Sequence, residues 1–445
     1  MEMNVFVDQL LAAAKAGGIE TAEAYAREEE SFSAKAMDQQ IEQYEVSATR
    51  SLSLRGTVGG KMGYASTEAF DDEAIRQLVE GVIEGAALNE EEEQDEIFPG
   101  EERYPELAAE ENDFAEVPAE DRLAIALGME AGLRAADERI RLTEGSNINV
   151  SQNRVLLRNS YGLNLERRGS LAFAYTVPVA RDGEATAIGI AFRVGRKLKN
   201  FDPDAIAREA ADEALSMLHA EPVASGDYRV VLRWDAMQSL LSAFSGIFSA
   251  ENAQQKLSLL AGREGETIAA PIVTLMDDPL RAGGLASRAF DDEGSACRTK
   301  AVVEAGVLKT LLHSRKTARK QGVETTGNAA KAGGAVHVAP TNFYLEPGGK
   351  TLDDLLKDMG EGLLITDLSG LHAGANPISG DFSLLSKGYV VKDGKKVSPV
   401  ERVTIAGNFY QLLRDIRAIG CDLNFPGSGI GAPSADVGTL KVSGK

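Results

Sequence analysis

The stretch Gly362–Phe382, GLLITDLSGLHAGANPISGDF, places one of the chain's four histidines in a run of polar and turn-forming residues. Turn formers at this density set the path of the backbone, and polar loops held between strands often carry binding or catalytic groups. His372, Asn376, Ser379 and Asp381 could hydrogen-bond a peptide backbone or orient a carbonyl group. The alternative is that His372 only stabilises its own turn.

A second cluster, within Phe290–Gly294, places three carboxylates side by side ahead of a glycine: Asp291, Asp292 and Glu293. Adjacent carboxylates could bind a hard cation or act as an acid–base pair. They could equally form a turn in which the acids accept hydrogen bonds from backbone amides. The sequence leaves both interpretations open.

Two polar elbows flank the Gly-rich piece Lys331–Gly334. Asn328 lies in the first elbow and Asn342 in the second. Such segments form a loop beside a groove or an ordinary surface connection, and the residue types alone do not separate the two.

Several kinds of chemistry are missing from the sequence. It has no GxxxxGK phosphate loop, no GxGxxG after a strand and no GxSxG elbow. It has no HExxH-like pair, and its two cysteines, Cys297 and Cys421, are far apart. A zinc site needs three or four ligands with some local spacing, so a zinc enzyme acting alone is disfavoured.

Charge is concentrated in one segment. The formal net charge is −21, and residues 90–121 contain fifteen acidic residues against one basic residue. Such a run is typical of a solvated linker, with an electrostatic lure for a basic partner as the alternative. No basic footprint for nucleic acid is present.

Further features indicate a cytoplasmic protein. No apolar run approaches the roughly 20 residues needed to span a bilayer, and two cysteines are too few for a disulfide framework. The N-terminus has no leading basic cluster and is interpreted as an amphipathic helix ended by Gly17-Gly18, not a signal peptide.

The elements that must position these groups predict an α+β fold. A chain of 445 residues is expected to form two or three domains. We predict an N-terminal α+β domain over residues 1–225 and a β-rich domain over 226–445, with the break at Pro222–Gly226. Alternating residues predict antiparallel strands over Ala22–Ser66 and 141–194. Helical spacing is present at Asp71–Ala87, Asp121–Asp137, Asp202–His219, Asp235–Ala250, Leu352–Met359 and Tyr410–Ile419.

Four long motifs in fixed order resemble the TldD/TldE (PmbA) family, some members of which have been described as modulators of DNA gyrase. They are RKTARKQGVETTGN at 315–328, PTNFYLEPG at 340–348, the 362–382 stretch and TIAGN at 404–408. The resemblance covers essentially the whole chain and brings Asn408 into the set of substrate or interface candidates.

The resemblance implies an N-terminal α+β domain of antiparallel sheets with helices, and a C-terminal domain on a large curved antiparallel sheet. It implies a two-subunit peptidase in which a TldD-type subunit carries an HExxxH zinc helix. The corresponding helix here is Asp235–Ala250, which has no histidine or glutamate. The chain is therefore similar to the TldE side, with no metal ligand of its own and zinc expected in the partner.

The leading hypothesis is an accessory subunit of a cytoplasmic metallopeptidase, forming a heterodimer with a TldD-type subunit and acting on peptides. When isolated, the chain could form a homodimer. The alternative is a peptide-binding or regulatory protein that acts without proteolysis. A third hypothesis is an independent hydrolase that uses Asp291, Asp292 and Glu293.

Overall fold

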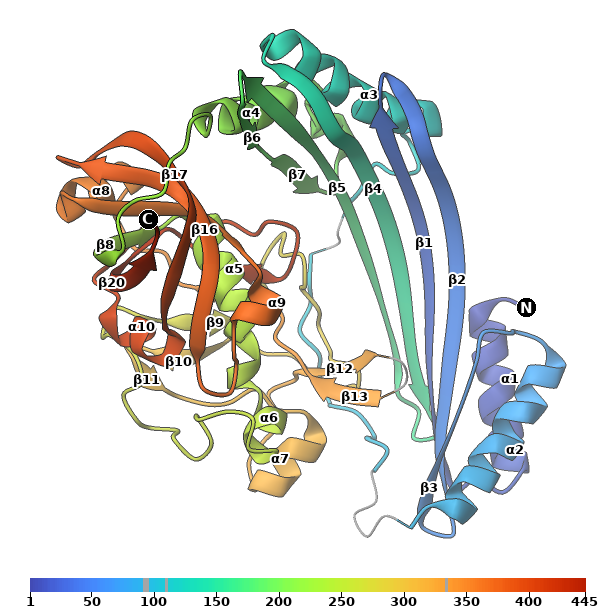
Figure 1. The fold of residues 1–445 in the computed structure, drawn as a ribbon. Coiled ribbons are helices and arrows are strands. Elements are labelled where there is room, and N and C mark those ends of the chain that lie inside the picture. Colours follow the sequence, from blue (N-terminus) through green and yellow to red (C-terminus); the bar gives the residue numbers. More distant parts are fainter. Residues whose placement is uncertain (91–95, 109–110, 333–334) are drawn as a thin grey trace.

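The structure is a computed structural model that describes residues 1–90, 96–108, 111–332 and 335–445. It has two parts: a long twisted sheet with helices at both ends, and a compact part formed by the second half of the chain (Figure 1). The predicted α+β class, with antiparallel sheets and helices, is confirmed by this architecture. Within the described residues, no helix is long and apolar enough to cross a membrane.

The first part is a seven-stranded antiparallel sheet in the order β3-β2-β1-β4-β5-β6, with β7 also pairing with β5. Four of its strands are 17 to 20 residues long and run the length of the molecule. Asp38 and Gln39 both have positive φ and join β1 to β2 in a tight hairpin turn. The strands are β1 Thr21–Met37, β2 Gln40–Val58, β3 Lys61–Thr67, β4 Ile140–Asn159, β5 Asn164–Asp182, β6 Ala185–Ile188 and β7 Ala191–Gly195.

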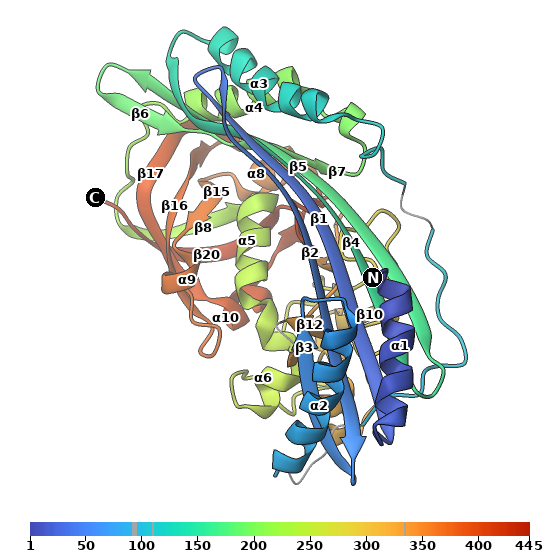
Figure 2. The same cartoon turned by 90° about the vertical axis from the view of Figure 1, so that its right-hand side faces the viewer.

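Helices cover the sheet at its two ends and leave its middle open (Figure 2). The even-numbered side chains of β1 all lie on one face of the sheet, because side chains alternate along a strand. This face is covered by helices at each end of the strand. Ala22, Ala24 and Ala26 pack at one end, and Phe32, Ala34 and Ala36 pack at the other. The helices are α1 Met3–Ala16 and α2 Asp72–Leu88 at the first end, and α3 Ala119–Ala136 and α4 Pro203–Ser216 at the second.

The connection between α2 and α3 carries the acidic run, and part of it lies outside the described residues. In its described portions, Ile97, Phe114 and Val117 are buried and most acidic side chains are exposed. The buried Asp113 accepts hydrogen bonds from the backbone amides of Leu198 (2.8 Å) and Lys199 (3.1 Å). The described connection is therefore anchored to the sheet part by apolar side chains and one buried acid.

The second part is built on a sheet that closes on itself. The strand order β17-β16-β15-β8-β20-β18 is completed by a β17–β20 pairing, and all pairs are antiparallel except β15 with β8. A five-stranded sheet in the order β11-β10-β9-β14-β19 and the β12–β13 hairpin complete it. The strands are β8 Gly226–Leu232, β9 Leu275–Asp277, β10 Lys300–Glu304, β11 Val307–Leu308, β12 Ala329–Ala332, β13 Ala335–Val338, β14 Phe343–Leu345, β15 Gly362–Ser369, β16 Asp381–Lys392, β17 Lys395–Asn408, β18 Ala418–Ile419, β19 Ile430–Gly431 and β20 Ala435–Ser443.

Two predicted helices of this part end earlier than expected. The helix predicted over Asp235–Ala250 is α5 up to Phe244, then one 3-10 turn, and Ser249 caps a new helix by accepting from the amide of Asn252. The helix predicted over Tyr410–Ile419 stops at Asp415, because Ala418 and Ile419 form β18. The helices are α5 Trp234–Phe244, α6 Ala250–Gln254, α7 Arg315–Gln321, α8 Leu352–Met359, α9 Leu371–Gly374 and α10 Phe409–Asp415.

Candidate functional site

The three adjacent carboxylates lie where the compact part meets the long sheet. The Asp291 carboxylate accepts hydrogen bonds from the amides of Glu293 (3.0 Å), Ser295 (2.9 Å) and Ala329 (3.0 Å). The Glu293 carboxylate accepts from the amide of Arg315 at 2.8 Å. Of the two interpretations left open by the sequence, the structure supports the turn whose acids bind backbone amides.

A buried ion network, here called the junction network, connects this turn to the sheet. It consists of Glu23, Tyr25, Arg55, Arg167, Asp292 and Lys331. On its first side, the carboxylate of Glu23 (1% exposed) accepts from Arg55 Nε at 2.9 Å and Nη2 at 3.2 Å. Lys331 Nζ, from the compact part, donates to the same carboxylate at 3.1 Å. One sheet carboxylate thus holds a cation from each part of the molecule.

Asp292 carries the second side of the junction network. Its Oδ1 accepts from Tyr25 Oη at 3.1 Å and from Arg167 Nη2 at 2.5 Å, both on the sheet. Its Oδ2 accepts from the backbone amide of Lys331 at 2.8 Å. The Lys331 ammonium lies 4.4 Å from the centroid of the Tyr25 ring, a cation–π contact. Each of the two carboxylates in the network, Glu23 and Asp292, therefore accepts hydrogen bonds from both parts of the molecule.

Burial and charge act against each other in the pKa values of this region. Burial opposes ionisation of Glu23 and of Asp292, but the Arg55 charge beside the first and the Arg167 charge beside the second lower their pKa values. Burial and the Asp292 charge raise the pKa of Tyr25 to about 12. Burial and the neighbouring Asp291 raise the pKa of Glu293 to about 7. Glu293 is thus a carboxyl group that titrates near neutral pH.

The structure brings four of the candidates from the 362–382 stretch and the TIAGN motif into one turn. Asn376 Oδ1 accepts from the amides of Ile378 (3.0 Å) and Ser379 (3.2 Å). Asn408 Nδ2 donates to the Ser379 carbonyl (2.8 Å) and to Asp381 Oδ1 (2.9 Å). These polar groups are engaged in local structure at an exposed turn between β15 and β16.

The remaining candidates separate into one exposed and two buried residues. His372 lies exposed on the short helix α9. Asn328 is fully buried and donates to Asp277 Oδ2 (2.8 Å) and to the Ala339 carbonyl (3.1 Å). Asn342 is also fully buried, and its amide nitrogen donates to Ser287 Oγ at 2.9 Å. Both asparagines hold loops in place, and Asn342 holds the loop that precedes the three carboxylates.

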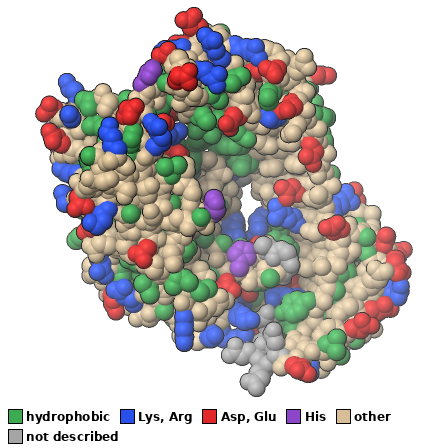
Figure 3. Space-filling model, in the orientation of Figure 1, with side chains coloured by type: hydrophobic (Ala, Val, Ile, Leu, Met, Phe, Trp, Pro, Cys, Tyr) green, Lys and Arg blue, Asp and Glu red, His purple; other side chains and the backbone are tan. Residues whose placement is uncertain are grey.

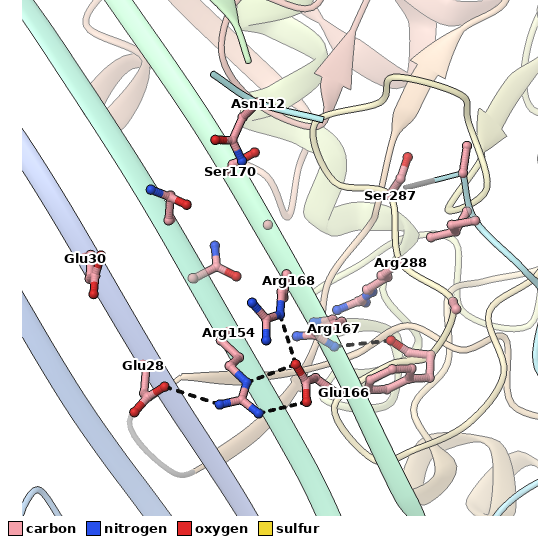
Figure 4. Close-up of a pocket in the computed structure, with 17 residues that line it drawn as sticks. Glu28, Glu30, Asn112, Arg154, Glu166, Arg167, Arg168, Ser170, Ser287 and Arg288 are labelled. Carbon is pink, nitrogen blue, oxygen red and sulfur yellow. Dashed lines mark hydrogen bonds and ion pairs between the residues drawn. The ribbon is translucent and has the colours of Figure 1, made fainter. Parts of the chain in front are cut away.

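A cavity lies beside that loop, between the middle of the sheet and Ser287–Phe290 (Figure 4). It has a volume of about 790 Å³. Arg154 bridges Glu28 and Glu166 across its floor, and Arg168 also donates to Glu166. The lining residues are Glu28, Glu30, Leu107, Ala108, Asn112, Gln152, Asn153, Arg154, Glu166, Arg167, Arg168, Gly169, Ser170, Ser287, Arg288, Ala289 and Phe290. We call this cavity the arginine cleft.

The sequence analysis missed the arginine cleft and all of the junction network except Asp292. Tyr25 and Asp292 are 267 positions apart, and Glu23 and Lys331 are 308 apart. No local pattern marks such pairs. For the cleft, the sequence offered one hint: Arg288 lies two residues before the motif Phe290–Gly294.

The side chains of α5 do not fit a zinc ion. Most of them, including Met237, Leu240 and Phe244, are packed in the apolar core. The one carboxylate on this helix, Asp235, is paired with Arg233 at 2.6 Å. Across the described ranges, no group of three or more His, Cys, Asp or Glu residues is placed to hold a metal ion.

A hollow separates the long sheet from the compact part. The space-filling view looks through it from the side of Figure 1, and blue Lys and Arg side chains gather at its rim (Figure 3).

Comparison with known proteins matches three domain families along the chain. They are the PmbA/TldA metallopeptidase domain 1 at residues 22–86, the central domain at 112–218 and the C-terminal domain at 225–444. The metalloprotease PmbA homolog of Haemophilus influenzae is 27% identical over 97% of this chain and 94% of its own length. The metalloprotease PmbA of Escherichia coli O157:H7 is 28% identical over 74% of this chain and 71% of its own length.

Solved structures match this chain over nearly its whole length. A Thermotoga maritima protein described as a proposed DNA gyrase modulator has a TM-score of 0.92 and 33% identity, covering 99% of this chain and all of that one. TldE from Thermococcus kodakarensis shares the fold, with a TM-score of 0.88 at 23% identity over 99% of this chain and all of that one. The resemblance seen in the sequence motifs is confirmed, and the chain belongs to the PmbA/TldD metallopeptidase family.

Proposed function

We propose that this chain is the TldE-type accessory subunit of a cytoplasmic two-subunit metallopeptidase that cleaves peptides. The observation that carries the proposal is that helix α5 has no histidine, where the family resemblance implies the zinc helix of TldD-type chains. A metal-bound water needs its ligands and a general base, and α5 offers neither. The zinc-bearing partner supplies both in this proposal.

The fold supports this division of labour. The long sheet and the compact part leave a hollow between them (Figure 3), and the buried junction network holds the two parts at a fixed separation. A rigid wall of this kind is suited to enclose a peptide against a second subunit. The chain then contributes shape and contacts, while the partner contributes hydrolysis.

The test is reconstitution. The chain is purified alone and after co-expression with a TldD-type chain from the same genome, and bound zinc and peptide cleavage are measured in both preparations. We expect cleavage and stoichiometric zinc only when the partner is present. Stoichiometric zinc with cleavage by the isolated chain contradicts the proposal.

A matched pair of partner variants makes the test sharper. Changing the zinc-binding histidines of the TldD-type chain should abolish cleavage without separating the subunits. Adding excess wild-type accessory chain should not restore it. Restored cleavage would place a hydrolytic centre in this chain.

The second candidate is a peptide-binding or regulatory protein that acts without proteolysis. It is favoured by the description of the Thermotoga maritima relative as a proposed gyrase modulator. The net charge of −21 argues against direct binding of duplex DNA. A supercoiling assay of gyrase with and without the purified chain tests it, and an unchanged supercoiling rate removes it.

A further inference from the structure

Arg288 stands out among the guanidinium groups of the arginine cleft. Its Nε and Nη2 are buried and have no hydrogen-bond partner among the described residues. The other arginines of the cleft are engaged: Arg167 with Asp292, and Arg154 and Arg168 with Glu166. Leaving guanidinium donors without a partner is unfavourable, because buried polar groups are normally hydrogen-bonded.

A second polar group of the same cleft is also unpartnered. Ser170 is 9% exposed, and its Oγ is buried without a hydrogen-bond partner in the described structure. It lies on β5, while Arg288 belongs to the loop of the compact part, so the two line the cleft from opposite parts of the molecule (Figure 4). The cleft lining therefore contains a second unsatisfied polar group, on the sheet side.

The position of Arg288 is fixed by the structure behind it. Asn342 donates to Ser287 Oγ (2.9 Å) and accepts from the Ala286 amide (3.0 Å). In Figure 4, Arg288 extends from this loop toward Arg167, and the charges of both lower the pKa of Asp292. Asp291 and Asp292 supply opposite charge near Arg288, but its Nε and Nη2 donors make no hydrogen bond to them and remain for an anion.

We propose that the arginine cleft binds a carboxylate through Arg288. Carboxylate suits the site because a planar guanidinium binds it with two parallel hydrogen bonds. Arg167 is paired with Asp292, and Arg154 and Arg168 are paired with Glu166, which leaves Arg288 as the arginine of the cleft with donors available for a ligand carboxylate. The volume of about 790 Å³ accommodates a ligand of several residues or a small organic acid.

This inference goes beyond the proposed accessory role, because carboxylate binding by this chain alone requires neither zinc nor a partner. Two sources share the chemistry: the C-terminal carboxylate of a peptide, and a free organic acid. The test therefore uses both kinds of probe on the purified full-length chain.

Fluorescence anisotropy is measured with fluorescein-labelled trialanine that ends in a free carboxylate, and with the same peptide ending in an amide. We expect the acid to bind about tenfold more tightly than the amide. Succinate is titrated by calorimetry as the small-acid probe. Binding of succinate without the peptide assigns the site to free acids, while equal binding of acid and amide, or no binding of either probe class, overturns the proposal.

Arg288→Gln should remove the preference for the acid, and Arg288→Lys should retain part of it, because lysine keeps the charge and loses the paired hydrogen bonds. Arg298→Gln is the matched control, since Arg298 lies outside the cleft and pairs with the exposed Glu324. Thermal unfolding of each variant checks that it folds. A folded Arg288→Gln variant that still prefers the acid contradicts the assignment.

Discussion

Two polar turns are prominent in the sequence, and they have different roles in the structure. The turn at Phe290–Gly294 is buried and holds the long sheet to the compact part through Asp292. The turn within Gly362–Phe382 is exposed, and its Asn376 and Asp381 bond to neighbours in the same turn or to Asn408. The first has long-range partners, and the second has local ones.

Polar composition therefore does not identify the structural role of a turn. Both stretches combine carboxylates, glycine and possible hydrogen-bonding groups. A carboxylate flanked by cations from a distant strand becomes part of the junction, whereas one beside an asparagine of its own turn only shapes the loop. Four experiments, given in order of decreasing effect, test this contrast.

Glu23→Gln should have the largest effect. It removes the carboxylate that hydrogen-bonds both Arg55 and Lys331 in a buried site, so both cations lose this partner. We expect a loss of about 3–5 kcal/mol in the free energy of unfolding, measured with urea. Asp381→Asn, in the exposed turn, should leave the urea midpoint close to that of the wild type. Equal effects of the two substitutions would break the contrast.

The pH dependence of stability should differ in sign between the two turns. The pKa of Glu293 is raised from 4.5 to about 7, so its folded form binds a proton more tightly than its unfolded form. The resulting stabilisation is complete below about pH 4.5 and is lost as the pH rises through 7. The pKa of Asp381 is lowered by Asn408, so its contribution is present above its ordinary pKa and is lost as the pH falls.

Urea unfolding of the wild type and of Glu293→Gln at pH 5 and pH 8 checks this sign. Glutamine does not titrate, so the variant should lose up to about 3 kcal/mol less than the wild type over that interval. The same measurement on Asp381→Asn serves as the control. A parallel pH dependence of Glu293→Gln and the wild type would show that Glu293 ionises normally in the folded chain.

Glycine substitution offers an intermediate test. Gly294 and Gly370 have similar backbone angles, with φ of +83° and +80°. A Cβ at Gly294 would lie 3.0 Å from Leu163 Cδ2 and 3.1 Å from Leu157 Cδ2, while one at Gly370 would meet no atom within 4 Å. Alanine should therefore cost about 2–3 kcal/mol at Gly294 and about 1 kcal/mol at Gly370. Both values are measured by urea unfolding. Equal costs would mean that the Phe290–Gly294 turn shifts to accommodate the added methyl group.

His372→Ala should have the smallest effect on stability, within about 0.5 kcal/mol, because the side chain is exposed on a short helix. The variant therefore isolates any role in association. If His372 contacts the peptide or the partner, co-purification with a TldD-type chain or peptide binding weakens while the urea midpoint stays unchanged. A large loss of stability would show that the exposed turn is structural after all.

Local elements of the fold were predictable from the sequence. The helix α8 was predicted at its observed bounds, Leu352–Met359, because its apolar spacing and its capping residue Thr351 act within a few residues. The strands of Ala22–Ser66 were likewise visible as alternation. The division of α5 and α6 was not, because the backbone of Phe248 and Ala250 there hydrogen-bonds with that of the distant Leu312 (2.8 and 2.9 Å).

The family, the α+β class and the lack of histidine on α5 could be read from the sequence alone, because these depend on residue types and on spacing along the chain. The tertiary structure alone decided that Asp292 meets Tyr25 and Arg167, that the polar loop at His372 stays exposed, and that Arg288 lines a cleft. Ion pairs between residues some 300 positions apart form only when a sheet and a distant loop come together. Their energies depend on burial, which no local pattern of residues specifies.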